Sequence, residues 1–344
     1  MHSIDLIITT YNRPEKVKLL LSQLFLVERG EGEIIIVDSS DIPIHEGIRG
    51  KQIKYLYSNH KNQPYQRYLG YLHSGAEILI FLDDDMEMTD SEFINKIDEL
   101  FNEESLVGIA LKFENKHKSS SLSDMPASKF AGHEGGMQRL KRFISGYPKL
   151  PPGKFGLCGN KGIQPSGGGP TEWVSGGAFA ARRSAMFLKF NFQLFEIFEK
   201  GFGMGEDSII GYGLSRQGRL IYHDKLFFLH NDQKDSTYTK NITSFARRIA
   251  FSRLYLSLEK CRLDKRKYFW ARLHYHYYML WRFVGLWLNY LMDTNEVRLR
   301  VLKGTFKGWR LATKFKFSGN DESFTYWNAE ATKDMSATRT DLID

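Results

Sequence analysis

The feature that most constrains this sequence is residues 78–85, a run of five large apolar residues that ends in three consecutive aspartates. An apolar run without polar alternation predicts a strand buried on both faces, as in a parallel sheet covered by helices. Because side chains alternate along an extended chain, Asp83 and Asp85 are expected to point the same way and Asp84 to the opposite side. The carboxyl ends of such strands are where open α/β sheets bind ligands.

Two neighbouring carboxylates suit a hard divalent cation, Mg²⁺ or Mn²⁺, which would bridge to the oxygens of a diphosphate. The alternative interpretation is a surface turn or a helix cap, since Asp is common in both. Thr89 and Glu92 have the spacing of a capping box for a helix over 93–101, so the aspartates are not needed as its cap. We therefore favour a functional site at the end of this strand.

Strands and helices are predicted to alternate through the first part of the chain. The strands are expected over 5–10, 33–37, 53–57, 78–82, 107–113 and 219–228, and the helices over 14–24, 64–74, 93–101 and 208–215. Short loops between alternating elements are typical of an α/β fold, with a Rossmann-like, mainly parallel sheet flanked by helices.

Glu206 and Asp207 form a second acidic pair, between a Gly-rich turn and the helix expected over 208–215. They could simply complement the helix dipole in its first turn. Alternatively, a carboxylate near an acceptor hydroxyl can take its proton as a general base. His230 follows the last strand; such a histidine is often structural, but it would suit a metal if the fold brings it near Asp85.

The pattern of strands and helices fails between about residues 114 and 170, where Gly, Ser, Pro and Lys dominate. This long irregular segment is either a loop that closes over a substrate or a structureless insertion. Order returns at Trp173, and the paired glycines Gly176 and Gly177 suggest a close approach of the backbone to another group.

The charge distribution divides the chain into three regions. Residues 240–316 hold 18 Lys and Arg against 4 Asp and Glu, a net of about +14 in a chain of net charge +8, whereas residues 1–239 are slightly acidic. We expect an α/β domain over 1–239, a basic helical extension over 240–317 and a loose polar tail over 318–344.

The basic region contains two expected helices, over 245–258 and 267–292, and the second carries a continuous stripe of aromatic and aliphatic residues. Arg272, Arg282 and two histidines argue against a membrane-spanning helix. Two interpretations remain: a helix that lies in the plane of an anionic membrane surface, or a stripe that packs on the N-terminal domain. No motif supports nucleic-acid binding, so nucleic acid is not expected as a partner.

Cys158 and Cys261 are the only cysteines, which favours a reducing compartment. The N-terminal residues go directly into the first strand and lack the features of a signal peptide. We therefore expect a cytoplasmic protein.

The order of these motifs resembles family 2 glycosyltransferases of the GT-A fold, from Ile4 to about His230. The motifs that carry the resemblance are residues 8–13 (Ile-Thr-Thr-Tyr-Asn-Arg), 36–41, Gln66 with Arg67, the Asp-x-Asp motif of Asp83 to Asp85, 173–177 with Arg182 and Arg183, Gly205 to Asp207, and 222–230. Thr9 stands where the family usually has Pro, and Gly213 where it often has Arg.

The resemblance implies an inverting transfer of a sugar from a nucleoside-diphosphate sugar to an acceptor hydroxyl, with Mn²⁺ or Mg²⁺ as cofactor. By position it implies that Thr10, Tyr11, Asp38 and Arg67 contact the nucleotide, with Asp83 and Asp84 beside them. Asp85 would be the principal metal ligand, assisted by Asp83 and His230. Asp207 would be the general base, and Glu206, Trp173, Gly176 and Gly177 would shape the acceptor pocket.

We expect the acceptor to be a cell-surface glycan or a lipid-linked acceptor, reached at the inner face of the plasma membrane if the basic helices bind lipid. Two alternatives remain open. A sugar nucleotidyltransferase can share the sheet and the acid-bound metal, but it usually has a basic Gly-rich loop after the first strand, which residues 11–14 do not form. A noncatalytic nucleotide-sugar-binding protein or membrane scaffold could retain the fold.

Overall fold

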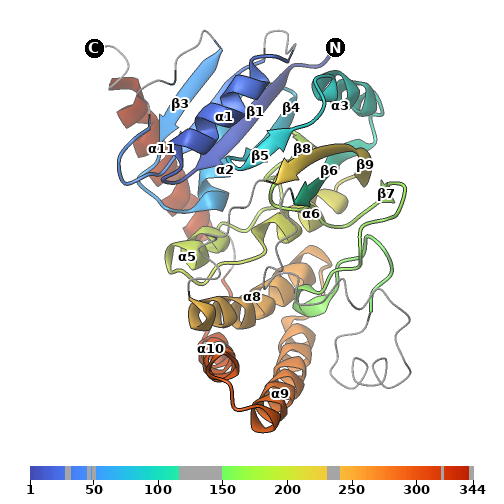
Figure 1. The fold of residues 1–344 in the computed structure, drawn as a ribbon, viewed down its shortest axis with the longest axis vertical. Coiled ribbons are helices and arrows are strands. Elements are labelled where there is room, and N and C mark those ends of the chain that lie inside the picture. The colour runs from blue at the N-terminus through green and yellow to red at the C-terminus, as the bar shows by residue number, and fades with distance from the viewer. Residues whose placement is uncertain are drawn as a thin grey trace.

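The computed structural model of the protein describes residues 1–27, 32–44, 48, 52–115, 149–230, 241–318 and 321–340 (Figure 1). Much of the irregular segment expected over 114–170 lies outside the described residues. From residue 149 onward its described part forms a short turn, η3 (Leu157–Gly159), and a two-residue strand, β7 (Gly169–Pro170).

The strands form one sheet in the order β3-β2-β1-β4-β8-β6-β9-β5, with β7 beside β9. The other bounds are β1 (Ile4–Thr10), β2 (Ile34–Asp38), β3 (Ile53–Tyr57), β4 (Ile78–Asp83), β5 (Met86–Met88), β6 (Leu106–Asn115), β8 (Ala178–Arg182) and β9 (Arg219–His230). The first four strands in this order are parallel, and β6 is also parallel to β9. The predicted Rossmann-like parallel sheet is therefore confirmed, and β8, β5 and β7 add antiparallel pairs to it.

Helices cover both faces of this sheet. The helices of the described residues are α1 (Pro14–Leu24), α2 (Gln63–His73), α3 (Phe93–Phe101), α5 (Gln193–Glu199), α6 (Glu206–Ser215), α8 (Ile242–Leu263), α9 (Tyr268–Met292), α10 (Glu296–Thr313) and α11 (Asp321–Thr340). Of these, α9 and α10 pack on α8. The apolar residues of α1 and α3 join one hydrophobic cluster, and those of α2, α5, α6 and α8 join another. The predicted α/β class with a C-terminal helical extension is thus confirmed.

Strand β4 shows why its sequence lacks alternation. Leu79 and Phe81 belong to the cluster beneath α2 and α6, whereas Ile80 and Leu82 belong to the cluster beneath α1 and α3. Each of these side chains is at most 1% exposed. Because both faces of the strand are covered, every position in it favours an apolar residue.

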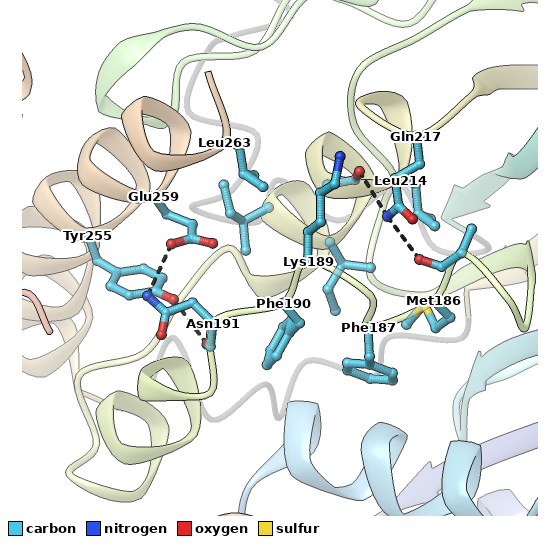
Figure 2. Close-up of a pocket in the computed structure, with 14 residues that line it drawn as sticks. Met186, Phe187, Lys189, Phe190, Asn191, Leu214, Gln217, Tyr255, Glu259 and Leu263 are labelled. Carbon is cyan, nitrogen blue, oxygen red and sulfur yellow. Dashed lines mark hydrogen bonds between the residues drawn. The ribbon is translucent and has the colours of Figure 1, made fainter. Parts of the chain in front are cut away.

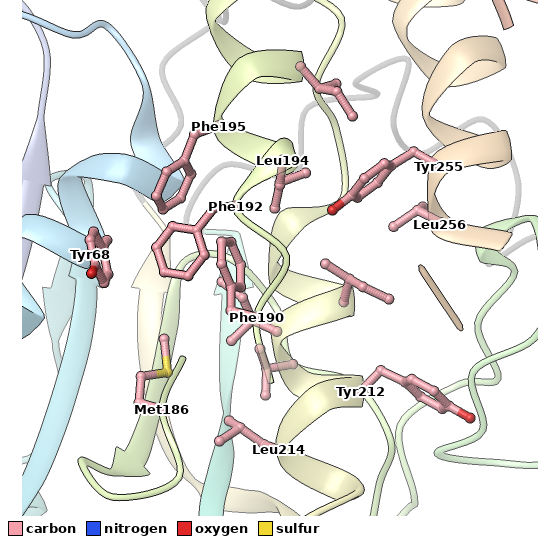
Figure 3. Packing of buried hydrophobic residues seen from close by; sticks show 14 of the residues in the cluster. Tyr68, Met186, Phe190, Phe192, Leu194, Phe195, Tyr212, Leu214, Tyr255 and Leu256 are labelled. Atoms are coloured by element: carbon pink, nitrogen blue, oxygen red, sulfur yellow. The ribbon is translucent and has the colours of Figure 1, made fainter. Parts of the chain in front are cut away.

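The cluster beneath α2 is rich in aromatic side chains, and Figure 3 shows Tyr68, Phe192 and Phe195 facing one another beside α5. Edge-to-face ring pairs join Tyr68 to Phe192 and Phe192 to Phe195, with centroids 5.0 and 5.4 Å apart. Trp327 of α11 adds a further ring against Phe195, at 5.3 Å. Such pairs contribute beyond the area that they bury.

Helix α11 corrects the expectation of a loose polar tail, because its described residues pack beside β3 and α2 (Figure 1). Trp327 is 1% exposed. Asp334 accepts a 3.0 Å hydrogen bond from the hydroxyl of Tyr65, and the hydroxyl of Tyr68 donates to Asn328. The sequence of this helix is polar because it docks largely through hydrogen bonds and one tryptophan.

The two helices expected in the basic region are confirmed as α8 and α9, and α10 was not expected. Helix α10 lies close against α8 at two glycines: a Cβ on Gly304 would come 2.3 Å from the carbonyl oxygen of Thr243, and one on Gly308 would come 2.3 Å from that of Arg247. Only glycine permits this approach. Figure 1 shows α9 and α10 beyond α8, at the end of the molecule farthest from the N-terminus.

Candidate active site

Parallel pairing brings the carboxyl ends of β1, β2 and β4 to one edge of the sheet. The strand register pairs Thr10 with Asp38 and Thr9 with Asp83. The side-chain amide of Gln66 on α2 donates to the backbone carbonyls of Thr10 and Val37, both at 2.9 Å. These bonds fix α2, and with it Arg67, against the edge of the sheet at which the predicted site residues lie.

Asp84 and Asp85 share one cation, Arg13. Its Nη1 lies 3.0 Å from Asp84 Oδ1 and 3.0 Å from Asp85 Oδ2, and Lys16 Nζ is 3.8 Å from Asp85. Thr10 also donates to Asp84, at 2.7 Å. The predicted alternation of the three aspartates is therefore wrong: β4 ends at Asp83, and Asp84 and Asp85 lie in the turn before β5.

His230 lies beside this cluster because its strand, β9, pairs with β5. Strand β5 pairs with the end of β9 so that Met86 is opposite His230, and the imidazole Nε2 then lies 3.5 Å from Asp85 Oδ2. Burial alone would raise the pKa of Asp85, but the hydrogen bond and charge of His230, together with Arg13 and Lys16, lower it below the ordinary value. Asp85 is thus held as a carboxylate.

Arg67 is the centre of a second cluster and is only 1% exposed. Its Nη2 donates to Asp83 Oδ1 at 3.1 Å and to the carbonyl of Gly176 at 2.7 Å, and its Nη1 lies 3.5 Å from Glu206 Oε1. Gln63 also donates to Asp83, at 2.8 Å. One buried guanidinium therefore joins the end of β4, the segment before β8 and the first turn of α6.

Loss of water around this cluster shifts the pKa values of its acids. Desolvation, reinforced by Asp85, Asp84 and Glu206, raises the pKa of Asp83 to about 7, although Arg67 opposes the shift. Burial and the neighbouring Asp207 raise the pKa of Glu206. Acids perturbed by burial and by specific neighbours are typical of functional sites.

Glu206 and Asp207 form the first turn of α6, which begins after a sharp turn of the chain at Gly205. Gly205 has a φ of +82°, a conformation that favours glycine, and it caps the helix. A Cβ on Gly176 would lie 3.7 Å from Asp207 Oδ2 and 3.8 Å from Arg67 Nη2. The predicted base therefore lies next to the Arg67 cluster, and Asp207 also accepts a 3.3 Å hydrogen bond from Ser208.

The segment from Trp173 to Gly177 lies between α6 and β4. A Cβ on Gly211 would be 2.5 Å from the backbone nitrogen of Val174, so α6 packs tightly on this segment. At its other end, the nitrogen of Asp83 donates to the carbonyl of Gly177 at 2.9 Å. The predicted acceptor residues are thus fixed beside the Arg67 cluster, between α6 and the end of β4.

Lys161 lies 4.5 Å above the ring of Trp173 and donates to Ser208 at 3.0 Å. This lysine was not predicted as a site residue, because it lies within the irregular segment of the sequence. Arg13 and Lys16 were not predicted either, although two cations three residues apart directly after a buried strand could have indicated an anion site at the sheet edge.

Among the predicted nucleotide contacts, Asp38 and Tyr11 are bonded to the loop that follows β2. Asp38 is fully buried, and its carboxylate accepts from the nitrogens of Ser40 and Ile44 and from the hydroxyl of Tyr55. It therefore fixes the loop that follows β2. Tyr11 is 40% exposed, and its hydroxyl donates to Asp41 in that same loop, at 3.2 Å.

Asp85 and His230 are an adjacent carboxylate and imidazole whose donor chemistry suits a divalent cation. No group of three or more such side chains placed to hold a metal occurs within the described ranges. Magnesium in proteins is often held by one or two protein ligands, with phosphate oxygens and water completing its shell. The residues present therefore fit a cation that is shared with a diphosphate.

The pocket in Figure 2 lies between α8 and the segment before α5, and it contains none of the predicted site residues. Asn191 and Glu259 are hydrogen-bonded at 3.2 Å on its wall. Its volume is about 20 Å³, which is room for about one water molecule. The clusters around Arg67 and Arg13 remain the candidate site.

The family model described as glycosyl transferase family 2 matches residues 5–159. No curated protein matches the chain. Among solved structures, the chain is similar to residues 1–349 of TarS from S. aureus (11% identity, TM-score 0.44, covering 92% of this chain and 93% of that one). It is also similar to the mannosyltransferase PcManGT from Pyrobaculum calidifontis, solved with GDP-Man and Mn²⁺ (11% identity, TM-score 0.46, covering 99% and 88%).

The matched segment contains β1, β2, α2 and the three aspartates at the end of β4, which carry the donor-side motifs quoted above. Glu206, Asp207 and His230 lie outside the match, and the fold brings them to the same two clusters. The resemblance to family 2 glycosyltransferases that the order of the motifs predicted is confirmed by this match over residues 5–159.

Proposed function

We propose that the protein is an inverting, metal-dependent glycosyltransferase that moves a sugar from a nucleoside-diphosphate sugar to an acceptor hydroxyl. The observation that carries the proposal is the position of Arg67. It contacts Asp83, at the end of the strand that carries the Asp-x-Asp motif, and Glu206, beside the proposed base Asp207. The proposed donor-side and acceptor-side acids therefore share one buried cation, which supports a single site.

The donor would bind across the carboxyl ends of β1, β2 and β4. Thr10, Asp83, Asp84 and Arg67 line this edge, with Tyr11 at its exposed rim. Asp38 would act indirectly, by holding the loop after β2 through its backbone hydrogen bonds. This arrangement follows the rule that α/β sheets bind ligands outside their carboxyl edge.

A bound Mn²⁺ or Mg²⁺ would supply the charge that neutralises a departing diphosphate. Asp85 and His230 would hold it, with Asp83 at the neighbouring strand end. Arg13 and Lys16 add positive charge at the same place, since both approach Asp85. These groups together favour the diphosphate as a leaving group.

Asp207 would take the proton of the acceptor hydroxyl. As the acceptor oxygen forms its bond to the anomeric carbon, the bond from that carbon to the diphosphate breaks, and its electron pair leaves with the diphosphate. Attack from the face opposite the leaving group inverts the anomeric configuration. Glu206, Trp173, Gly176 and Gly177 would position the acceptor, which we propose to be a cell-surface glycan or a lipid-linked molecule.

Donor binding is tested by isothermal titration with UDP, GDP and dTDP, with and without Mn²⁺. We expect one nucleotide to bind in a metal-dependent manner, and Asp85→Ala to abolish the dependence. Lack of binding to all three would contradict the proposed donor site and favour a noncatalytic scaffold.

The base is tested by Asp207→Asn, which we expect to bind donor nearly as well as the wild type while losing sugar transfer. A loss of about 10²-fold or more is the usual scale for removing a general base. Asp90→Asn is the matched control, because the Asp90 carboxylate accepts from the nitrogen of Glu92 and pairs with Lys96 on α3, neither of which is a proposed site residue. Near-normal turnover of Asp207→Asn would assign the base to another group.

A further inference from the structure

Helix α9 has an exposed face made of large apolar side chains. Between Tyr268 and Met292, 11 large hydrophobic residues are each 40–76% exposed. The face is represented by Trp270, Leu273, Tyr277, Leu280, Trp281 and Leu288, which recur at the spacing of one helical stripe. Single exposed apolar residues are ordinary on a protein surface, but a contiguous face of this kind marks a binding surface.

The charged residues of α9 do not interrupt this face. Arg272 donates to the carbonyl of Phe315 at 3.2 Å, and Arg282 donates to the hydroxyl of Tyr278 at 3.2 Å. Both guanidinium groups therefore turn toward the packed side of the helix.

The opposite side of α9 is fixed against its neighbours. Tyr275 is buried and donates to the carbonyl of Ala250 on α8 at 2.8 Å. Trp309 of α10 donates to His276 at 3.0 Å. The exposed apolar stripe therefore cannot turn inward unless these contacts are broken.

Positive charge lies beside the apolar face. Lys265 and Lys267 are exposed just before α9, and Lys303, Lys307 and Arg310 form an exposed stripe along α10. Phe306, between two of these lysines, contacts Phe283 of α9 with ring centroids 5.7 Å apart. The cations of α10 thus border the helix that carries the apolar face.

We propose that the apolar face of α9 docks the protein on an anionic membrane surface, with α9 in the plane of the interface and the cations of α10 near lipid head groups. Aromatic and aliphatic side chains on one face with Lys and Arg beside them are typical of interfacial helices. Within the described residues, no helix is long and apolar enough to cross a bilayer. A second copy of the chain fits less well, because it would bring together two regions of about +14 each.

The surface is connected to the proposed acceptor side of the site. Arg248 of α8 donates to the carbonyl of Gly203 at 2.7 Å, two residues before the glycine that caps α6. Helix α8 also contacts both α9 and α10. Docking would therefore hold the acceptor side at a fixed position relative to the lipid, which deepens the proposed function by favouring a membrane-associated acceptor.

The test is flotation of the full chain with vesicles of phosphatidylcholine alone and of phosphatidylcholine with phosphatidylglycerol, at low and at physiological salt. We expect binding to the anionic vesicles and a blue shift in tryptophan fluorescence, since Trp270, Trp281 and Trp287 are three of the six tryptophans. Absence of wild-type binding to anionic vesicles at low salt would overturn the proposal.

Two sets of variants locate the surface. Trp270→Glu with Leu273→Glu and Leu280→Glu should lower the partition coefficient by about tenfold or more. The matched control replaces Leu19, Phe25 and Leu26, which are exposed at the other end of the molecule, with Glu and should bind as the wild type does. Equal binding of the two triple variants would contradict the role of α9.

The second set, Lys303→Gln with Lys307→Gln and Arg310→Gln, keeps the apolar face and should weaken binding to anionic vesicles most strongly at low salt. Sedimentation of the wild type without vesicles tests the competing interpretation, a dimer. A dimer that the α9 variant converts to a monomer would assign the apolar face to a second copy instead.

The vesicle assay uses no donor, so its failure leaves the nucleotide-binding test of the transferase intact.

Discussion

The guanidinium of Arg67 lies 3.1 Å from the carboxylate of Asp83 although the arginine is only 1% exposed. Arg67→Met keeps much of the volume but leaves Asp83 and Glu206 without their cation, so we expect a loss of about 3 kcal/mol in the free energy of unfolding. Urea unfolding measures it. In Arg67→Met combined with Glu206→Gln, part of the loss should return, since one uncompensated acid is removed. Additive losses would contradict a direct interaction.

Glu206 should make stability depend on pH. Its pKa in the folded protein is raised above 4.5 by burial and by Asp207, so ionisation opposes folding once the pH exceeds the value of the unfolded chain. The stabilisation that protonated Glu206 contributes is fully present below about pH 4.5. It is lost as the pH rises through the raised pKa of the folded protein.

Glu206→Gln should therefore melt higher than the wild type at pH 8, and the difference should shrink toward pH 4.5. Thermal unfolding at several pH values measures it. Exposed Glu104→Gln is the control, with a small difference expected at each pH. A Tm difference for Glu206→Gln that does not change with pH would contradict the prediction.

Arg13 should compete with a divalent cation, because it holds both Asp84 and Asp85. Arg13→Ala is expected to bind Mn²⁺ several-fold more tightly in the absence of nucleotide, as titration followed by electron paramagnetic resonance of free Mn²⁺ would measure. Lys18→Ala, on the exposed side of α1, should leave the affinity unchanged. Weaker Mn²⁺ binding in Arg13→Ala would mean that the arginine supports the metal site.

The close packing of α8 and α10 predicts opposite effects for two similar substitutions. Gly304→Ala places a methyl group 2.3 Å from a backbone carbonyl and should destabilise the protein by about 1–3 kcal/mol. Gly285→Ala in α9, where no atom lies within 4 Å of the new Cβ, should stabilise it by about 0.5–1 kcal/mol. Urea unfolding distinguishes them, and equal effects would show that packing at Gly304 is not restrictive.

Neighbouring residues in α11 provide a further test. Trp327 packs against Phe195 and Tyr65, so Trp327→Ala should cost about 3–5 kcal/mol. Tyr326 is 52% exposed, and Tyr326→Ala should change stability by no more than about 0.5 kcal/mol. Little change for Trp327→Ala would mean that α11 contributes little to the fold.

The elements that the sequence predicted well are those whose local pattern matches their surroundings. Strand β4 lacks polar residues because both of its faces are covered, and Pro14 opens α1 as expected. Helix α11 was not predicted, because its docking depends on partners such as Tyr65 that are distant in sequence. Local periodicity carries no information about such partners.

The site was predictable in its residue types but not in its geometry. Asp83 and Glu206 were both identified, but the side chain that joins them, Arg67, could be placed only after the fold brought α2 and α6 together. The grouping of Asp84 with Asp85 depends on where β4 ends, and strand ends are poorly defined by an apolar pattern. Asp38 is satisfied by backbone groups whose positions only the loop geometry reveals.

The docking of α11 has a consequence for synthesis of the chain. The aromatic cluster beneath α2 includes Tyr65, early in the chain, and Trp327, near its end. During translation the N-terminal strands emerge long before this tryptophan, so the cluster stays incomplete, and α2 with Arg67 lacks its outer support, until α11 has left the ribosome. The nascent protein must therefore keep a partly open aromatic surface while the residues between Tyr65 and Trp327 are being synthesised.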